Sequence, residues 1–485
     1  MHTAPVEAVS THAQYDTEHV PLLSPHPLER KTPTPLPKQL FVILCLCLAE
    51  PITSSVIYPF ITELIATLGV THGDDRKVGY YAGIIESIFF LTETCLILQY
   101  GRLSDRIGRR PVVLLGLFGL AFSITSFGLA KTFVGLVVAR ALSGALNGNA
   151  GVIKSIVCEI TDETNRAQSF ALLSVTWSAG STIGPVLGGS LAHPASRFPS
   201  VFAHPVWQSV PFPNRLGFWK EYPYFLPCFA ATGVAIAAWC VALMFLRETL
   251  PAKRIHLVRK ATSEYGTITW DAERPATTQS DSAIPCAGLR AVLTPRVGWA
   301  IGSFMLLSLV DIAWVVLQPL VFATTPTLGG LGLSPPTIGL ILGAQGLFSG
   351  IFQATAFSSL HARFGAVRIF RVALACYAGL FLSFVIMTRV EGWLVWIVVA
   401  VHVVMSCVAS LGFSCTFIFV TSSTPSPSLL GTTNGLAQTS CSLVRALGPA
   451  GAASLFALSS GSGMAYWVCA SVVAFAGAVS LGVVE

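Results

Sequence analysis

The sequence predicts an all-α membrane protein whose twelve transmembrane helices form two pseudo-symmetric six-helix bundles. Three observations lead to this prediction: an apolar composition, twelve apolar runs of membrane-spanning length, and short motifs that recur between the two halves. Of the 485 residues, 53% are hydrophobic and 11% are charged, whereas about 25% are charged in an ordinary soluble domain. The chain therefore has too few charged residues for a soluble protein of its length.

Twelve apolar runs follow a polar N-terminal segment. They are 40–62, 78–99, 111–130, 133–154, 168–191, 223–246, 297–321, 337–359, 367–388, 392–420, 428–456 and 464–483. A helix of about 20 apolar residues crosses the hydrocarbon layer, and longer ones are expected to tilt. We expect four regions: a disordered cytoplasmic tail (1–37), an N-terminal six-helix bundle (38–246), a cytoplasmic central loop (247–296) and a C-terminal six-helix bundle (297–485).

Two motifs recur at similar offsets and support the division into halves. Residues Leu103, Arg106 and Gly108 recur 257 positions later as Leu360, Arg363 and Gly365. The pair Gly184-Pro185 recurs 264 positions later as Gly448-Pro449. Small residues let membrane helices approach closely, so we expect helix packing at Gly184, Pro185, Gly188, Gly189, Gly448 and Pro449. Homologous halves would enclose a central cavity.

The distribution of basic residues predicts the orientation. Of the 29 Lys and Arg residues, 20 fall in segments that this topology makes cytoplasmic, seven fall outside and two lie within spans. Lys154 and Arg166 are counted in the cytoplasmic loop after the fourth span. Because short Lys- and Arg-rich loops stay in the cytoplasm, both termini are expected there.

The segment Gly101-Arg-Leu-Ser-Asp-Arg-Ile-Gly-Arg-Arg-Pro111 joins the second and third runs. Its glycines permit a tight reversal, and Asp105 can pair with Arg106 or Arg109. The pattern Gly-x-Leu-x-Asp-Arg-x-Gly-Arg-Arg resembles the signature loop of the major facilitator superfamily. This resemblance implies a cytoplasmic gate formed by Gly101, Asp105, Arg106, Gly108 and Arg109.

Four further segments resemble motifs of that superfamily or of its branches. Arg140 followed by Gly144 is similar to its fourth-span motif, and Gly180 to Gly189 resembles the motif of its drug:proton antiporters, although Ala171 replaces an upstream Gly. The aromatic loop before the sixth span and the motifs in the eleventh span resemble those of fungal relatives of plant zinc-induced-facilitator proteins and of natural-product-cluster transporters. The resemblance does not fix the substrate.

Ionisable side chains inside the spans are the candidate functional residues, because each costs roughly 2.5 to 3.5 kcal/mol at the centre of a membrane helix. An offset of about 260 relates Glu50 to Asp311, Glu93 to Gln353 and Arg140 to His402, as expected if both halves line one cavity. Glu86 and Glu93 lie two turns apart and share a helix face. We assign proton coupling or substrate contact to Glu50, Glu86, Glu93, Arg140, Asp311, Gln353, His402 and Arg445. Each acid could instead form a structural ion pair with Arg140 or Arg445, and His402 could be a satisfied interior histidine.

These features predict a secondary active transporter, a proton-coupled exporter of a small organic molecule such as a drug or secondary metabolite. The alternatives are a proton symporter or facilitator for nutrient uptake, and a nutrient sensor that does not transport. No nucleotide-binding, metal-binding or nucleophile motif stands in a polar segment, so we expect neither an enzyme, a metal nor a cofactor. The expected partners are a small molecule, protons and the lipid bilayer, without nucleic acid, for a monomer in the plasma or vacuolar membrane.

Overall fold

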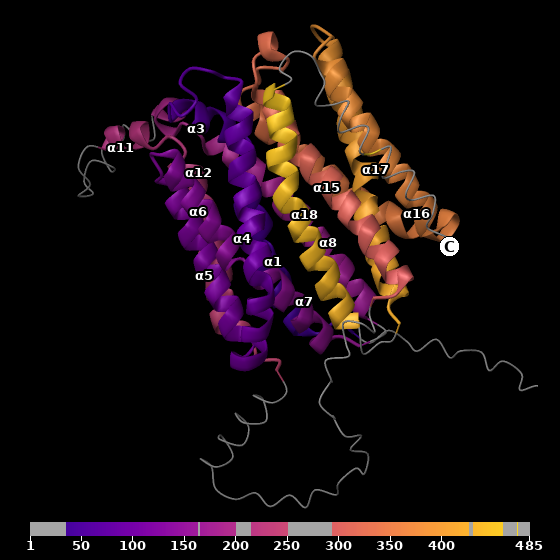
Figure 1. Cartoon of the computed structure of the whole chain (residues 1–485). Helices are drawn as coiled ribbons and strands as arrows, with labels where there is room; N and C mark the ends of the chain where they lie inside the picture. The colour runs from indigo at the N-terminus through magenta and orange to yellow at the C-terminus, as the bar shows by residue number, and fades with distance from the viewer. Residues whose placement is uncertain are drawn as a thin grey trace, which may run out of the picture.

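We describe the protein from a computed structural model of the chain. The structure describes residues 35–162, 165–199, 215–250, 293–425, 430–458 and 473. Most of the predicted tail and central loop, and the twelfth span except Val473, therefore lie outside the described residues. The regular elements within these ranges are helices (Figure 1).

The described part of the N-terminal half contains seven helices of ten or more residues and four shorter ones. They are α1 (Lys38–Cys47), α2 (Ala49–Ser55), α3 (Ile61–Thr67), α4 (Lys77–Ile107), α5 (Arg109–Gly128), α6 (Phe133–Leu146), α7 (Asn149–Ile160), α8 (Arg166–Leu191), α9 (Pro194–Arg197), α11 (Arg215–Glu221) and α12 (Phe225–Phe245). The first predicted span is thus broken between α1 and α2, and the fourth between α6 and α7. The fourth helical stretch also continues beyond the predicted end at Lys154.

The C-terminal half contains fewer and longer helices. They are α15 (Pro295–Ala323), the short 3₁₀ helix η2 (Pro326–Leu328), α16 (Pro335–Met387), α17 (Leu394–Ser423) and α18 (Leu430–Leu458). The eighth and ninth predicted spans are both part of α16, which bends sharply at Gly365. Apart from 464–483, each predicted span therefore coincides with a helix, a broken helix or one arm of α16. Within the described ranges, nine helical stretches are long and apolar enough to cross a membrane, with α16 counted once.

Two glycines at equivalent positions of the repeat make the same backbone turn. Gly108 between α4 and α5 has φ 105° and ψ 161°, and Gly365 within α16 has φ 73° and ψ 162°. Residues with a Cβ rarely adopt positive φ, so glycine is needed at both places. The repeated motif thus corresponds to a repeated chain reversal.

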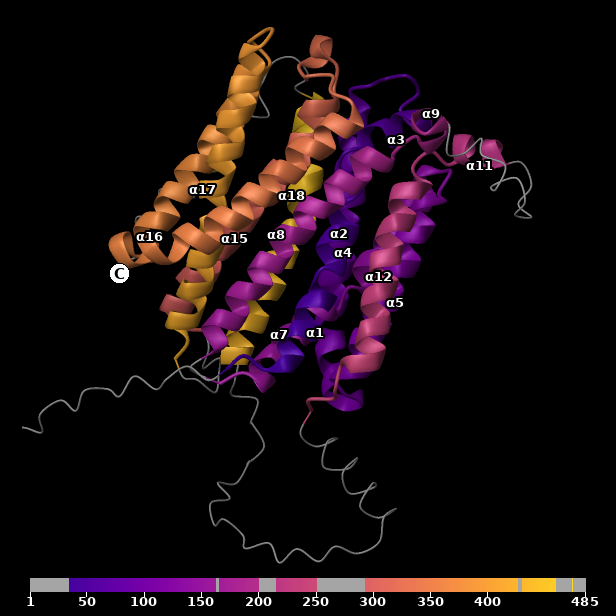
Figure 2. The ribbon, with the colours of Figure 1, turned by 180° about the vertical axis from the view of Figure 1, so that it is seen from behind.

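The two halves meet along two pairs of helices, α4 with α18 and α8 with the first arm of α16 (Figure 2). A Cβ on Gly83 would lie 2.7 Å from the Pro449 carbonyl oxygen, and one on Gly189 would lie 2.3 Å from the Pro335 carbonyl oxygen. The backbones therefore touch at the end of the molecule opposite the signature loop.

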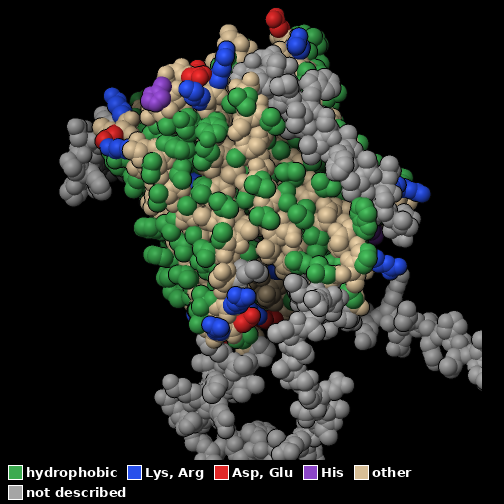
Figure 3. Space-filling model, viewed as in Figure 1, with side chains coloured by type: hydrophobic (Ala, Val, Ile, Leu, Met, Phe, Trp, Pro, Cys, Tyr) green, Lys and Arg blue, Asp and Glu red, His purple; other side chains and the backbone are tan. Residues whose placement is uncertain are grey.

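The outer surface has the polarity that a membrane requires. Hydrophobic side chains cover the middle of the visible face, while Lys, Arg, Asp and Glu lie toward its upper and lower ends, with further Lys or Arg side chains at its right-hand edge (Figure 3). Large apolar side chains such as Phe118, Val134 and Met244 are more than half exposed. Lipid chains, rather than water, suit such a belt.

Candidate functional site: a polar cluster between the halves

Glu50 lies immediately after the break in the first span. Pro51 has no N–H to donate to the Cys47 carbonyl, so the helix is interrupted at Leu48 and restarts at Ala49. The Thr53 hydroxyl donates to the Ala49 and Glu50 carbonyls, at 2.8 and 3.0 Å. The helix break and the Thr53 hydrogen bonds together fix the backbone at Glu50. The Glu50 side chain, which is partly exposed, therefore projects from the middle of a membrane span.

The break in the fourth span supplies the amide that holds Glu50. Asn147 lies between α6 and α7, and its Nδ2 donates to Glu50 Oε1 at 2.9 Å and approaches Glu93 Oε1 at 3.4 Å. A Cβ on the next residue, Gly148, would lie 2.0 Å from the Tyr100 ring, so glycine allows this close approach. One buried amide therefore connects carboxylates from the first and second spans.

A second buried contact joins the same two neighbouring helices, α4 and α6. The Arg140 guanidinium forms an ion pair with Glu86, and the Tyr58 hydroxyl donates to Glu86 Oε1 at 2.9 Å. Gly144 permits this contact, because a Cβ there would lie 2.0 Å from the Phe89 carbonyl oxygen. Glu86 and Glu93, two turns apart, thus both face the fourth span, but Glu86 is ion-paired whereas Glu93 is not.

Two cations approach this cluster from opposite halves. Lys154 of α7 and Arg445 of α18 both interact electrostatically with Glu50 and Glu93. Among the described residues, neither has a carboxylate oxygen within the 4.0 Å of an ion pair. The Arg445 guanidinium instead lies 5.9 Å from the Phe90 ring and 5.8 Å from the Phe413 ring, at distances typical of cation–π contacts.

Asp311 and Gln353, two of the polar residues predicted in the C-terminal half, have hydrogen-bond partners within that half. Tyr377 donates to Asp311 Oδ1 at 2.8 Å, and Gln353 Nε2 donates to Ser414 Oγ at 2.8 Å. Asp311 also interacts electrostatically with Arg445, which links it to the cluster. Glu50 and Asp311 therefore occupy equivalent positions in the repeat but bind different groups.

His402 is fully buried in a hydrogen-bond network of its own. Trp314 Nε1 donates to His402 Nε2 at 3.2 Å, and Ser383 Oγ lies 2.6 Å from His402 Nδ1. Because Nε2 accepts a hydrogen bond, the neutral ring carries its proton on Nδ1 and donates it to Ser383. The structure does not place His402 beside the Glu50 cluster.

The signature loop is organised by Arg109. Its guanidinium pairs with Asp105 at 2.7 Å and with Glu159 of α7 at 2.9 Å, and also donates to Ser104 at 2.9 Å. Glu248, which follows α12, accepts from the Arg109 backbone N–H at 2.8 Å and so caps the start of α5. Asp105 is thus bound within the N-terminal half. Gly101 has open space where a Cβ would stand, and the Arg106 side chain is exposed.

The predicted small-residue motifs lie at helix contacts. A Cβ on Gly184 would lie 2.2 Å from Ser55 Oγ, and one on Gly188 would lie 1.9 Å from the Val56 carbonyl oxygen. The equivalent Gly448 lies against Ile312 of α15, at 2.5 Å by the same measure. The repeat therefore preserves the contact of the fifth span with the first and of the eleventh with the seventh.

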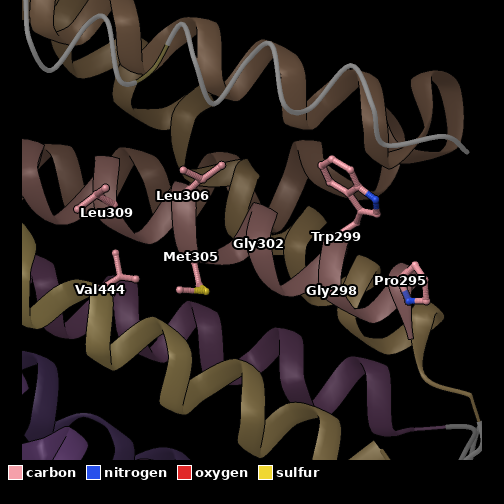
Figure 4. Close-up of a pocket in the computed structure, with 8 residues that line it drawn as sticks. All are labelled: Pro295, Gly298, Trp299, Gly302, Met305, Leu306, Leu309 and Val444. Atoms are coloured by element: carbon pink, nitrogen blue, oxygen red, sulfur yellow. The ribbon is translucent and has the colours of Figure 1, made fainter. Parts of the chain in front are cut away.

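An apolar groove of about 550 Å³ lies along α15 and does not belong to the polar cluster (Figure 4). It is lined by Pro295, Gly298, Trp299, Gly302, Met305, Leu306, Leu309 and Val444. None of these is one of the charged residues described above.

Helices that cross a membrane, arranged as two repeated halves with ionisable groups between them, define a multi-span membrane transporter. The chain belongs to the Major Facilitator Superfamily, whose family model matches residues 43–449. The resemblance seen in the signature loop is thus confirmed, and the protein is a transporter rather than an enzyme.

Relatives of the chain include fungal and plant transporters. It is 31% identical to "Major facilitator-type transporter psiT2" of Psilocybe cyanescens, covering 89% of this chain and 86% of that protein. It is 29% identical to "Major facilitator superfamily multidrug transporter mfsB" of Aspergillus fumigatus, covering 90% and 81%. It is 28% identical to "Protein ZINC INDUCED FACILITATOR-LIKE 1" of Arabidopsis thaliana, covering 86% and 83%. The predicted fungal and plant kinship is confirmed.

Solved transporter structures share the fold. A bacterial homologue of the human lysosomal transporter Spinster, in an inward-facing and unoccupied conformation, superposes with a TM-score of 0.63 at 14% identity. The match covers 91% of this chain and 95% of that one.

Proposed function

We propose that the protein is a proton-coupled exporter that exchanges protons for a small organic molecule by alternating access. The observation on which this rests is the position of Glu50, a partly exposed carboxylate at a helix break between the halves, held by Asn147 and close to two cations. A carboxylate in such a place can bind a proton or a substrate in turn. The relative described as a multidrug transporter supports export of drug-like molecules.

In this proposal the two halves enclose a crevice that contains the polar cluster. The two seams, which are the contacts of α4 with α18 and of α8 with α16, close one end of the crevice, and the signature loop lies at the other end. Arg109 holds that loop in one conformation through Asp105 and Glu159. Arg140 forms an ion pair with Glu86, and we assign proton exchange to Glu50 and Glu93, which have no ion-pair partner among the described residues. Asp311 contributes to the coupling through Arg445, the one cation among the described residues with which it interacts electrostatically.

We further propose the predicted arrangement in the membrane: both termini in the cytoplasm and one chain as the functional unit. The excess of Lys and Arg on the side of the signature loop supports this orientation. The four predicted regions of the chain are proposed with it. The plasma membrane and the vacuolar membrane are both compatible with this topology.

The test uses purified protein in vesicles with an imposed pH gradient and the dye rhodamine 6G as the transported probe. We expect the gradient to drive the dye against its concentration, and Glu50→Gln to abolish that uphill flux while dye-for-dye exchange continues. Glu391→Gln, an exposed acid in the turn between α16 and α17, is the matched control. Undiminished uphill flux in Glu50→Gln would remove Glu50 from the mechanism, and flux in the same direction as the protons would indicate symport.

A further inference from the structure

The ammonium group of one lysine in the N-terminal half makes its hydrogen bond and its aromatic contact with the C-terminal half. Lys154 lies on α7, but its Nζ donates to Gln438 Oε1 of α18 at 2.8 Å and lies 5.7 Å from the Phe417 ring of α17. The sequence places Lys154 in a loop, whereas the structure places it on a helix between the halves.

The charges around Lys154 offer it a second set of partners. The titratable groups that interact electrostatically with it are Cys47 of α1, Glu50 of α2, Glu93 of α4, and Cys441 and Arg445 of α18. Both carboxylates belong to its own half, and neither is within ion-pair distance. In the structure the Lys154 ammonium binds a neutral amide although two carboxylates lie near it. When both carboxylates are ionised, their attraction for the ammonium increases, and we expect Lys154 to move from the amide to them.

The Gln438 contact lies nearer the signature loop than the glycine contacts between the halves. On α18, Pro449, Ala450 and Ala453 lie against α4, and Gln438 is about three helical turns nearer the signature loop. On the other seam, the glycine contacts extend as far as Gly350 beside Ser178. The Lys154–Gln438 hydrogen bond therefore joins the two halves on the signature-loop side of the α4–α18 glycine contacts.

We infer that Lys154 is a positioning residue that alternates between Gln438 and the carboxylates of Glu50 and Glu93, and so couples their protonation to opening of the crevice on the signature-loop side. This inference rests on the proposed function. With both acids protonated, Lys154 stays on Gln438 and the crevice is bridged. When the acids lose their protons, Lys154 turns back to its own half, the bridge breaks and the crevice opens.

The experiment measures a distance and does not depend on transport. Spin labels are placed at Arg102 and Arg363, exposed residues at the signature loop and at its repeat, in a full-length chain whose native cysteines are replaced. The distance between the labels is recorded by pulsed electron paramagnetic resonance in lipid nanodiscs from about pH 5 to about pH 9, a range that spans perturbed carboxylates. We expect the population with widely separated labels to grow as the pH rises. Arg389→Gln, at the opposite end of the molecule, should leave this response unchanged.

Substitutions on both sides of the contact give opposite expected shifts. Lys154→Gln should remove the pH response, whereas Lys154→Arg should restore it. Gln438→Leu should leave the labels widely separated at every pH. Gln438→Glu should pair with Lys154, so the labels should stay close together up to a higher pH than in the unmodified protein. These two variants also test the inference if Lys154→Gln does not fold. A normal pH response in Lys154→Gln, or in both Gln438 variants, would overturn the inference while leaving proton-coupled export intact. Loss of the response in Lys154→Gln together with absence of gradient-driven flux in the unmodified protein would retain the switch and reject export.

Discussion

Arg140 and Glu86 form a buried ion pair that joins α6 to α4. Seven residues further along each helix, Asn147 approaches Glu93 at 3.4 Å. Two turns of helix separate the two levels, so the same faces of the second and fourth spans meet twice. At one level the acid is neutralised by a guanidinium, and at the other it meets only an amide. This difference is the reason why we propose a structural role for the Arg140–Glu86 level and proton exchange for the level of Glu93.

Removing the acid of the buried pair should destabilise the protein. Glu86→Gln leaves the Arg140 guanidinium buried without its counter-ion, which typically costs about 3 to 5 kcal/mol. We expect a clear fall in the thermal unfolding temperature of the purified protein in detergent. Glu221→Gln breaks the exposed ion pair with Lys131 and serves as the control, with little expected change. Equal effects of the two substitutions would contradict this account of the pair.

Adding one methyl group at the seam between the halves should change the conformational equilibrium. In Gly189→Ala the new Cβ would meet the Pro335 carbonyl oxygen at 2.3 Å, so α8 and α16 must separate. We expect the end of the molecule that carries α9 to open, as measured by distances between labels across that seam, and gradient-driven transport to fall. Gly233→Ala on α12 is the matched control, because nothing lies within 4 Å of its Cβ position. An unchanged distance in Gly189→Ala would show that the seam tolerates a side chain.

His402 should affect stability and leave the pH dependence of transport unchanged. His402→Leu leaves the buried Trp314 N–H without its acceptor, at a cost of about 1 to 3 kcal/mol, whereas the Ser383 hydroxyl still donates to the Leu380 carbonyl. We expect a lower unfolding temperature and an unshifted pH profile of dye transport. A shifted profile in folded His402→Leu would instead make the ring a proton carrier.

The signature loop should control rate more than stability. In Asp105→Asn, Arg109 keeps Glu159 and Ser104, and Asp105 has a side chain that is 64% exposed, so the loss of stability should stay below about 1 kcal/mol. We expect slower turnover with an almost unchanged unfolding temperature. Glu159→Gln, which removes the less exposed partner, should lower both. Wild-type turnover in Asp105→Asn would remove the gating role proposed for that residue.

The helices were largely predictable because their causes are local. Apolar length predicts a span, and the recurrence of Gly108 as Gly365 predicts that a chain reversal is repeated in the second half. The seam glycines were predictable as packing residues, but their partners in the other half were not, since composition carries no information about which helices meet.

The polar cluster was predicted only in part, for an identifiable reason. Asn147 and Lys154 were missed as site residues because Asn147 carries no charge, and because Lys154, the last residue of the predicted fourth span, was counted in the loop after it. Their spacing contains a usable pattern, since Arg140, Asn147 and Lys154 are each seven residues apart and therefore recur on one face of the span. Glu248 was missed because its role depends on the distant start of α5.

The glycine contact between α8 and α16 bears on proton leakage in the proposed exporter. There the Pro335 carbonyl lies so close to Gly189 that an added methyl group would collide with it, which leaves little space for water between the two backbones. Protons cross membrane proteins along files of water molecules. In the proposed proton-coupled exporter, this seam would therefore act as insulation and limit loss of the gradient while no substrate is bound.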